Sequence, residues 1–249
     1  MDDVLTFGVV PQQAMEKLAQ NWLPLTRYLS EKTGYNIQFA TAPNIPEFEK
    51  RLAAGEYDFA YMNPYHFVLF NESSGYRAIA RQKNHVIRGI IVVAASLEAE
   101  TLEDLAGADL AFPAPRAFAA TMITRAFLDD AAPGYTATFV KSHDSVYRAV
   151  ASGLLMGGGG IVRTFNEMPD EIRKKLEVLW LSPGYTGHAI TVHPGVPEDI
   201  AATVQRAMIE LADSETGRDI LKGLGMKALQ TAKDSDWDDV RELGLGQPE

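Results

Sequence analysis

Three short apolar runs have the character of β-strands: LTFGVV at residues 5–10, IQFA at 37–40 and YDFAYM at 57–62. Helical patterns separate them. Apolar side chains recur at steps of four and three residues over 14–29, and a second helical pattern covers 45–54. We expect Pro24 to bend or divide the first helix. Strands that alternate with helices favour parallel pairing with right-handed crossovers, so this region predicts a βαβαβ unit.

The same alternation restarts after a long β-branched run, GIIVVAA at 89–95. The patterns predict helices at 65–71, 102–105, 116–130, 144–154 and beyond Pro197, and strands at 109–112, 136–140, 161–162 (led into by the glycines at 157–160), 176–181 and 189–192. The predicted fold class is therefore α/β, with two lobes and no flexible linker. The chain would cross between the lobes in two strands, near 89–95 and 188–193. Lobe 1 is expected to hold residues 1–91 and 192–249, and lobe 2 residues 92–191.

Composition indicates a globular chain and narrows its partners. Of 249 residues, 46% are hydrophobic and 22% charged, and no apolar run approaches the roughly 20 residues of a bilayer-spanning helix. The formal net charge of −10 disfavours nucleic acid as a partner. A small anion remains possible, because a local cradle of N–H groups acts at contact distance.

Signatures of metal, cofactor or covalent chemistry are not found in the sequence. The chain has no Cys, its five His residues are scattered without an HExxH motif, and there is no Gly-x-Ser-x-Gly elbow. The glycines at 157–160 lack the Gly-Lys-Ser/Thr ending of a phosphate loop. We therefore predict no cofactor, no metal and no catalytic residue. A proton-transfer pair made by His143 and Asp144 is the alternative that an enzyme would require.

Hydrogen-bonding side chains gather just after the third predicted strand. Tyr61, Asn63, Tyr65 and His66 lie within six residues, with Asn63 suited to a helix N-cap and Pro64 to the first turn. One interpretation is a cap followed by aromatic packing. The interpretation that we favour is a ligand-binding wall, because ligands collect at the carboxyl ends of strands in α/β sheets.

Two segments of the second lobe occupy equivalent positions. Ser142, His143, Asp144 and Ser145 follow a predicted strand and open a helix, where hydroxyls, N–H groups and the helix dipole can surround an anionic oxygen. A protonated His143 would add a charge-assisted bond, whereas Asp144 would oppose an anion unless it points away or receives the ligand's own proton. Simple helix capping by Ser142 or Asp144 is the alternative.

The other segment is small-residue rich and lies between a strand and a helix. Phe118, Ala119, Ala120 and Thr121 would let an anion approach the backbone, although good packing explains such a segment equally well. Arg163 follows the glycines, which can admit either a ligand or a neighbouring backbone. This Arg is a candidate fork for a carboxylate or phosphate, with a surface salt bridge as its alternative. Tyr185 precedes the proposed return strand and is a further binding candidate.

Several motifs together resemble the PhnD-like solute-binding proteins of phosphonate and phosphite ABC importers. They are LTFGVVP at 5–11 with WLPL at 22–25, YDFAYMNP at 57–64, AFPAP at 111–115 and SHDSVY at 142–147, and the resemblance covers nearly the whole chain. It implies a type II periplasmic binding fold, in which two α/β lobes joined by two hinge strands close on a ligand in the cleft between them. It also implies a non-enzymatic function.

Carried over by motif, the family's oxyanion-binding roles fall on 117–121, on His143 and on Tyr61. The chain departs from the family's Ser/Thr-rich turn, because Thr121 is the only hydroxyl in that segment. The implied ligand is a phosphonate, phosphite or related oxyanion, and the implied partner is an ABC permease. A sensor input domain acting through a membrane kinase is the alternative within the same fold.

The resemblance implies a periplasmic location. Met1-Asp2-Asp3 lacks the basic region of a secretory signal, so we expect either a cytosolic protein or a chain whose leader has been replaced by a start methionine.

Overall fold

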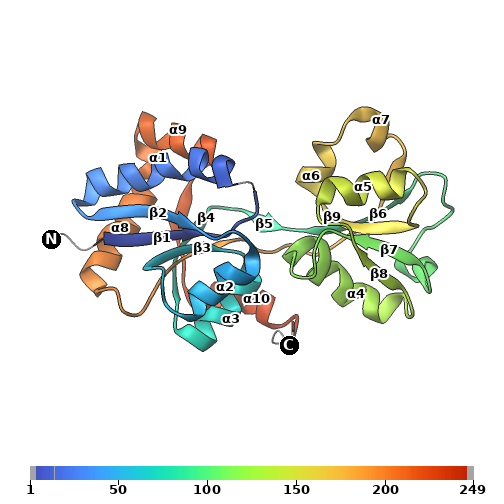
Figure 1. Cartoon of the computed structure of the whole chain (residues 1–249), viewed down its shortest axis with the longest axis horizontal. Coiled ribbons are helices and arrows are strands. Elements are labelled where there is room, and N and C mark those ends of the chain that lie inside the picture. The colour runs from blue at the N-terminus through green and yellow to red at the C-terminus, as the bar shows by residue number, and fades with distance from the viewer. Residues whose placement is uncertain (1–3, 14, 246–249) are drawn as a thin grey trace. The chain divides into compact units, whose positions relative to one another are not determined.

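The structure is a computed structural model that describes residues 4–13 and 15–245. These residues form two compact units (Figure 1). Unit 1 is built mainly from the described parts of Met1–His85 and Thr186–Glu242, and unit 2 mainly from Val86–Tyr185. Where the chain passes between them, two short strands pair with each other: β5 (Val86–Ile87) and β11 (Tyr185–Thr186). The segment considered for a leader, residues 1–3, lies outside the described residues.

The sheet of unit 1 has six strands in the order β13-β4-β12-β3-β1-β2. Its members are β1 (Val4–Val9), β2 (Asn36–Thr41), β3 (Phe59–Met62), β4 (Arg77–Gln82), β12 (Ala189–Val192) and β13 (Leu229–Thr231). β1 is parallel to β2 and β3, which confirms the predicted βαβαβ pairing, whereas β12 is antiparallel to β3 and β4. The sequence patterns did not predict β4 and β13, because charged and polar residues mask the short apolar part of each strand.

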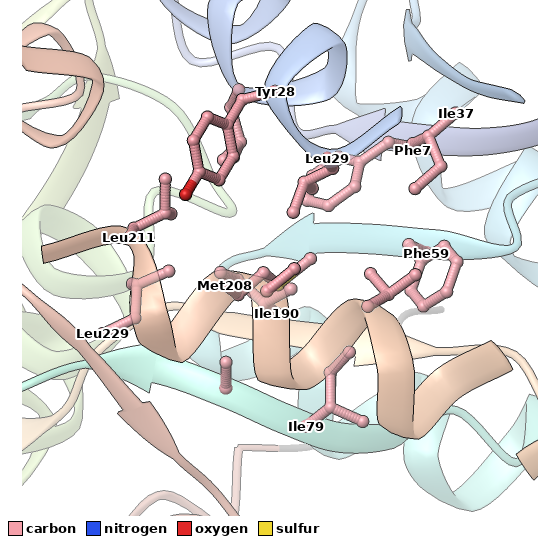
Figure 2. Packing of buried hydrophobic residues seen from close by; sticks show 14 of the residues in the cluster. Phe7, Tyr28, Leu29, Ile37, Phe59, Ile79, Ile190, Met208, Leu211 and Leu229 are labelled. Carbon is pink, nitrogen blue, oxygen red and sulfur yellow. The ribbon is translucent and has the colours of Figure 1, made fainter. Parts of the chain in front are cut away.

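Helices pack on this sheet. They are α1 (Met15–Thr33), α2 (Ile45–Ala53), α3 (Pro64–Ser74), α8 (Glu198–Ile209), η3 (Glu210–Asp213), α9 (Glu215–Gly223), η4 (Asp234–Trp237) and α10 (Asp238–Arg241). Of these helices, α1, α8, η3 and α9 share one buried apolar cluster with the sheet. Figure 2 shows Phe7 and Phe59 of the sheet packed with Leu29 of α1 and Met208 of α8. Pro24 lies inside α1 without dividing it. None of the helices in the described ranges combines the length and hydrophobicity that crossing a bilayer requires.

Unit 2 has a five-stranded sheet in the order β10-β6-β9-β7-β8. Its strands are β6 (Gly89–Ala94), β7 (Asp109–Phe112), β8 (Thr136–Phe139), β9 (Gly157–Ile161) and β10 (Leu176–Leu181). Its helical elements are η1 (Leu102–Leu105), η2 (Phe118–Ile123), α4 (Thr124–Ala131), α5 (His143–Ala151), α6 (Val162–Asn166) and α7 (Asp170–Arg173). β7 is parallel to β8 and β9, whereas β6 is antiparallel to β9 and β10.

Two predictions for unit 2 need correction. The glycines 157–160 do not precede a strand but form most of β9, and Val162 begins a helix instead of continuing a strand. Glycine weakens strands because it has no side chain to pack, so its presence argued against this assignment. The predicted helix at 116–130 starts at Phe118 with a π-helical segment, η2, before it continues as α4.

Candidate functional site

The predicted residues of unit 2 meet at one edge of its sheet. β7, β8 and β9 are parallel, so their carboxyl ends lie together, and η2, α5 and α6 follow these three ends in turn. Segments 118–121 and 142–145 and Arg163 therefore surround the same edge. This is where loops and helix N-termini offer N–H groups to a ligand in α/β sheets.

Thr121 places a hydroxyl in this edge without any partner. The residue is 1% exposed, and its Oγ1 is buried with no hydrogen bond within the described residues. Its backbone N–H donates to the Ala117 carbonyl at 2.8 Å. Phe118, Ala119 and Ala120 are also buried and contribute backbone and small side chains around it. An unpaired buried hydroxyl costs free energy that a ligand oxygen could recover.

His143 also carries a polar atom that lacks a partner. Its Nδ1 is buried and makes no hydrogen bond in the described part of the chain. Burial, and secondarily the positive charge of Arg163, lowers the pKa of His143 from 6.5 to about 4. The free ring is therefore neutral at neutral pH. It offers an ordinary hydrogen bond, so the charge-assisted bond considered from the sequence does not arise in the unliganded protein.

Ser142 caps α5, as the structural alternative proposed. Its Oγ accepts a hydrogen bond from the Ser145 N–H at 3.1 Å and lies 2.8 Å from the Ser145 Oγ. Asp144 points along the helix surface, where its carboxylate accepts from Arg148 Nε at 2.7 Å. The arrangement reduces the electrostatic conflict between Asp144 and an anion. It also engages the carboxylate that a His143–Asp144 proton-transfer pair would need.

Arg163 is mostly exposed. It approaches Glu167 to 4.0 Å one turn along the helix, which is the surface salt bridge of the alternative interpretation. Nearby, Tyr147 connects α5 to β9 and α6: its hydroxyl accepts from the Ile161 N–H at 3.1 Å and lies 2.9 Å from Thr164 Oγ1. Sequence patterns do not single out Tyr147, because it lies on the apolar face of its helix with Val146 and Val150.

In unit 1, the polar residues after β3 are largely internal. Asn63 is 2% exposed and caps α3, where its Oδ1 accepts from the His66 N–H at 2.8 Å. His66 is fully buried, with its Nε2 3.1 Å from Glu49 Oε1. Tyr65 is buried beside the His66 ring. Capping and packing, the alternative interpretation, account for these contacts.

Tyr61 lies at the carboxyl end of β3 and is only half-buried. Its ring stacks on His188, with centroids 4.9 Å apart, and packs against Trp22 at 4.5 Å. The Gln12 amide contacts His188 Nε2 at 2.9 Å. Gln12 and Trp22 were not predicted as site residues, although Gln12 follows the carboxyl end of β1 and that position is a usable signal. Tyr185, in β11, is buried.

No cluster of His, Cys, Asp or Glu in the described ranges could hold a metal ion.

Comparison with protein families gives the group to which the chain is similar. The family model described as "ABC transporter, phosphonate, periplasmic substrate-binding protein" matches residues 7–237. No curated protein matches the chain in sequence.

Solved structures share the fold. PhnD1 from Prochlorococcus marinus, in complex with methylphosphonate, is 18% identical with a TM-score of 0.84, and the match covers 98% of each chain. A binding protein component of a phosphonate ABC transporter from Pseudomonas aeruginosa is 15% identical with a TM-score of 0.79, over 98% of this chain and 86% of that one. A Xanthomonas citri protein bound to ATP is 15% identical with a TM-score of 0.81, and the match covers 96% of this chain and 95% of that one.

The two-unit α/β architecture is that of the type II periplasmic binding proteins, as predicted. The family consists of substrate-binding proteins and not of enzymes. With a family model that spans residues 7–237, the chain belongs to the phosphonate-binding periplasmic substrate-binding proteins of ABC transporters.

Proposed function

We propose that this protein is the periplasmic receptor of an ABC importer and captures a small oxyanion, such as a phosphonate or phosphite. The observation that carries the proposal is a pair of buried polar atoms, Thr121 Oγ1 and His143 Nδ1, that have no partner among the described residues and lie at the carboxyl edge of one sheet. Unpaired buried polar groups are rare, and each calls for a ligand, a water or a function. A tetrahedral oxyanion presents several acceptor oxygens that such groups can satisfy.

The donors around this edge suit an anion held by neutral groups. Thr121 and the Ser142–Ser145 hydroxyl pair can donate, and neutral His143 donates when its proton is on Nδ1. Arg163 adds positive charge without being buried. Asp144 is held by Arg148, so its negative charge is partly compensated. The site therefore needs no buried cation, whose desolvation would be costly.

The family relation supports the rest of the proposal. A structural relative was solved with methylphosphonate, which makes this ligand the natural first probe. Tyr61 stays a predicted ligand contact of unit 1, and an ABC permease would receive the ligand. The implied location is the periplasm.

Isothermal titration calorimetry tests the proposal. The wild-type protein is titrated with methylphosphonate, phosphite, phosphate and sulfate under one buffer condition. We expect saturable binding of methylphosphonate or phosphite, with weaker binding of sulfate. Absence of heat with every member of the panel, confirmed by an unchanged melting temperature at high ligand concentration, would reject the ligand class.

A further inference from the structure

Strand β9 contains four consecutive glycines, all buried. Gly157 to Gly160 pair with β6 on one side, and Gly157 and Gly158 also pair with β7 on the other. A strand so poor in side chains stabilises itself weakly. Its composition must therefore be explained by what lies against its two faces.

One face receives the backbone of η2. A Cβ added at Gly159 would overlap the carbonyl oxygen of Ala120, and one added at Gly89 of the neighbouring strand would overlap the carbonyl oxygen of Ala119. The two carbonyls belong to successive residues of the segment that ends in Thr121. Backbone atoms of η2 therefore contact the sheet directly. A side chain at either glycine would prevent this close contact.

The opposite face receives α5. A Cβ at Gly158 would lie 2.6 Å from Val146 Cγ1, and one at Gly160 would overlap the Tyr147 hydroxyl. Successive residues of a strand point to opposite faces, which explains the alternation. The same short strand thus seats both elements that carry the unpartnered atoms, Thr121 on η2 and His143 on α5.

We propose that Gly159 and Gly89 are positioning residues for ligand binding: they set the depth of η2 against the sheet and thereby the place of the Thr121 hydroxyl. This inference rests on the proposed function for its effect on binding. Thr124 supports the same geometry, because its Oγ1 lies 2.8 Å from the Ala120 carbonyl oxygen and 3.1 Å from that of Thr121. The glycines of the sheet allow η2 to approach closely, and the Thr124 hydroxyl holds the Ala120 carbonyl of η2 from the helix side.

The decisive variant is Gly159→Ala, with Gly157→Ala as its matched control. Gly157 lies in the same strand, but a Cβ there would meet Val92, Val93 and Leu110 at 3.0–3.3 Å and no atom of η2. Both variants add one methyl group to one strand. A general destabilisation of β9 would affect both variants alike, whereas only Gly159→Ala should displace η2.

The first readout needs no ligand. Backbone amide chemical shifts of residues 118–123 are compared in wild type, Gly159→Ala and Gly157→Ala. We expect the Gly159 variant to shift these signals while Gly157→Ala leaves them near wild type. A folded Gly159→Ala protein with unshifted η2 signals would overturn the inference.

The second readout is the dissociation constant for methylphosphonate. We expect Gly159→Ala to weaken binding about 10-fold or more, because a displaced donor leaves a ligand oxygen unpaired, and Gly157→Ala to stay within about 2-fold. Thr121→Val separates the two proposals. Loss of affinity in Thr121→Val with wild-type affinity in Gly159→Ala overturns the positioning role. No binding by wild type rejects the proposed function, whereas unchanged affinity in both Thr121→Val and His143→Ala places the ligand site elsewhere. In either case the amide shifts alone decide the positioning of η2.

A milder variant covers the case in which Gly159→Ala does not fold. Thr124→Val keeps the side-chain shape and removes the hydroxyl that holds the Ala120 carbonyl. We expect the same η2 signals to shift and affinity to fall by roughly 3-fold to 10-fold. A folded Thr124→Val protein with unshifted η2 signals and wild-type affinity contradicts the inference.

Discussion

His66 of unit 1 and His143 of unit 2 occupy similar places in the two units. Each follows a strand and lies in the first turn of a helix that a polar residue caps, Asn63 in one case and Ser142 in the other. Their surroundings differ sharply. His66 Nε2 contacts the nearly buried Glu49 carboxylate at 3.1 Å, whereas His143 makes no carboxylate contact in the described chain and its Nδ1 is buried there without a hydrogen bond.

A histidine in the first turn of a capped helix thus has two different environments in this protein. Around His66, the capping amide, the Glu49 carboxylate and the rings of Phe48 and Phe70 form an internal cluster that holds α3 in place. Around His143, burial and the charge of Arg163 favour the neutral ring, and Asp144 and Arg148 of the same helix pair with each other. We therefore infer that the first histidine stabilises the fold, and we propose the second as a ligand contact.

The largest expected effect comes from His66→Ala. This change removes the contact with Glu49 and opens a cavity among aromatic rings, so we expect a loss of about 3 kcal/mol in the free energy of unfolding. Urea denaturation measures it. Methylphosphonate affinity of the folded variant should stay within about 2-fold of wild type. A strong loss of affinity with intact stability would show that His66 contacts the ligand and would erase the contrast with His143.

The pH dependence of stability tests the His143 half of this comparison. The pKa of His143 in the folded protein, about 4, lies below its ordinary 6.5. The unfolded chain therefore takes up this proton first, and stability falls as pH drops from about 6.5 to about 4, by up to about 3 kcal/mol. Well above pH 6.5 the ring is neutral in both the folded and the unfolded chain, so His143 causes no loss of stability there.

Urea unfolding at pH 7 and pH 4.5 measures this term in wild type and in His143→Ala. Carboxylates titrate in both proteins, so the difference between the two pH slopes isolates His143. We expect wild type to lose more stability than the variant on acidification. Equal slopes would mean that His143 has an ordinary pKa in the folded protein.

Next in size are the ligand contacts of unit 2. Removing one hydrogen-bond donor from a buried anion should cost about 1.5–3 kcal/mol of binding free energy, so Thr121→Val and His143→Ala should each weaken methylphosphonate binding by about 10-fold or more. Stability at pH 7 should change little in Thr121→Val, because its hydroxyl has no partner to lose. Calorimetric titration with a parallel melting curve checks both statements, and wild-type affinity in both variants would place the site elsewhere.

The smallest effect is expected from Asp144→Asn. Its carboxylate is exposed and directed to Arg148, so methylphosphonate affinity should remain equal or rise by up to about 2-fold as a negative charge is removed. Titration at low and high salt measures the change, and the increase should disappear at high salt. A 10-fold loss would show that Asp144 receives a proton from the ligand.

Strand positions with strong apolar patterns were predictable from the sequence. The strands at 109–112, 176–181 and 189–192 are found at the predicted residues. β9 was not, because its stability comes from neighbours that press on both faces of its glycines, and no local pattern encodes such neighbours. This strand therefore forms because of tertiary packing and not because of local sequence preference.

The candidate site divides in the same way. The sequence placed 118–121 and 142–145 after strands, and parallel pairing brings both to one sheet edge. It could not distinguish His66 from His143, because the distinction depends on Glu49, which approaches His66 from α2. The stacking of His188 on Tyr61 likewise joins residues far apart in the chain.

The most direct measurement of the central contrast is nitrogen NMR of the imidazole side chains, with and without methylphosphonate. The account predicts that the ring nitrogens of His143 shift on ligand addition, while those of His66 stay in place. Saturable methylphosphonate binding that moves the His66 nitrogens and leaves those of His143 unchanged would contradict it.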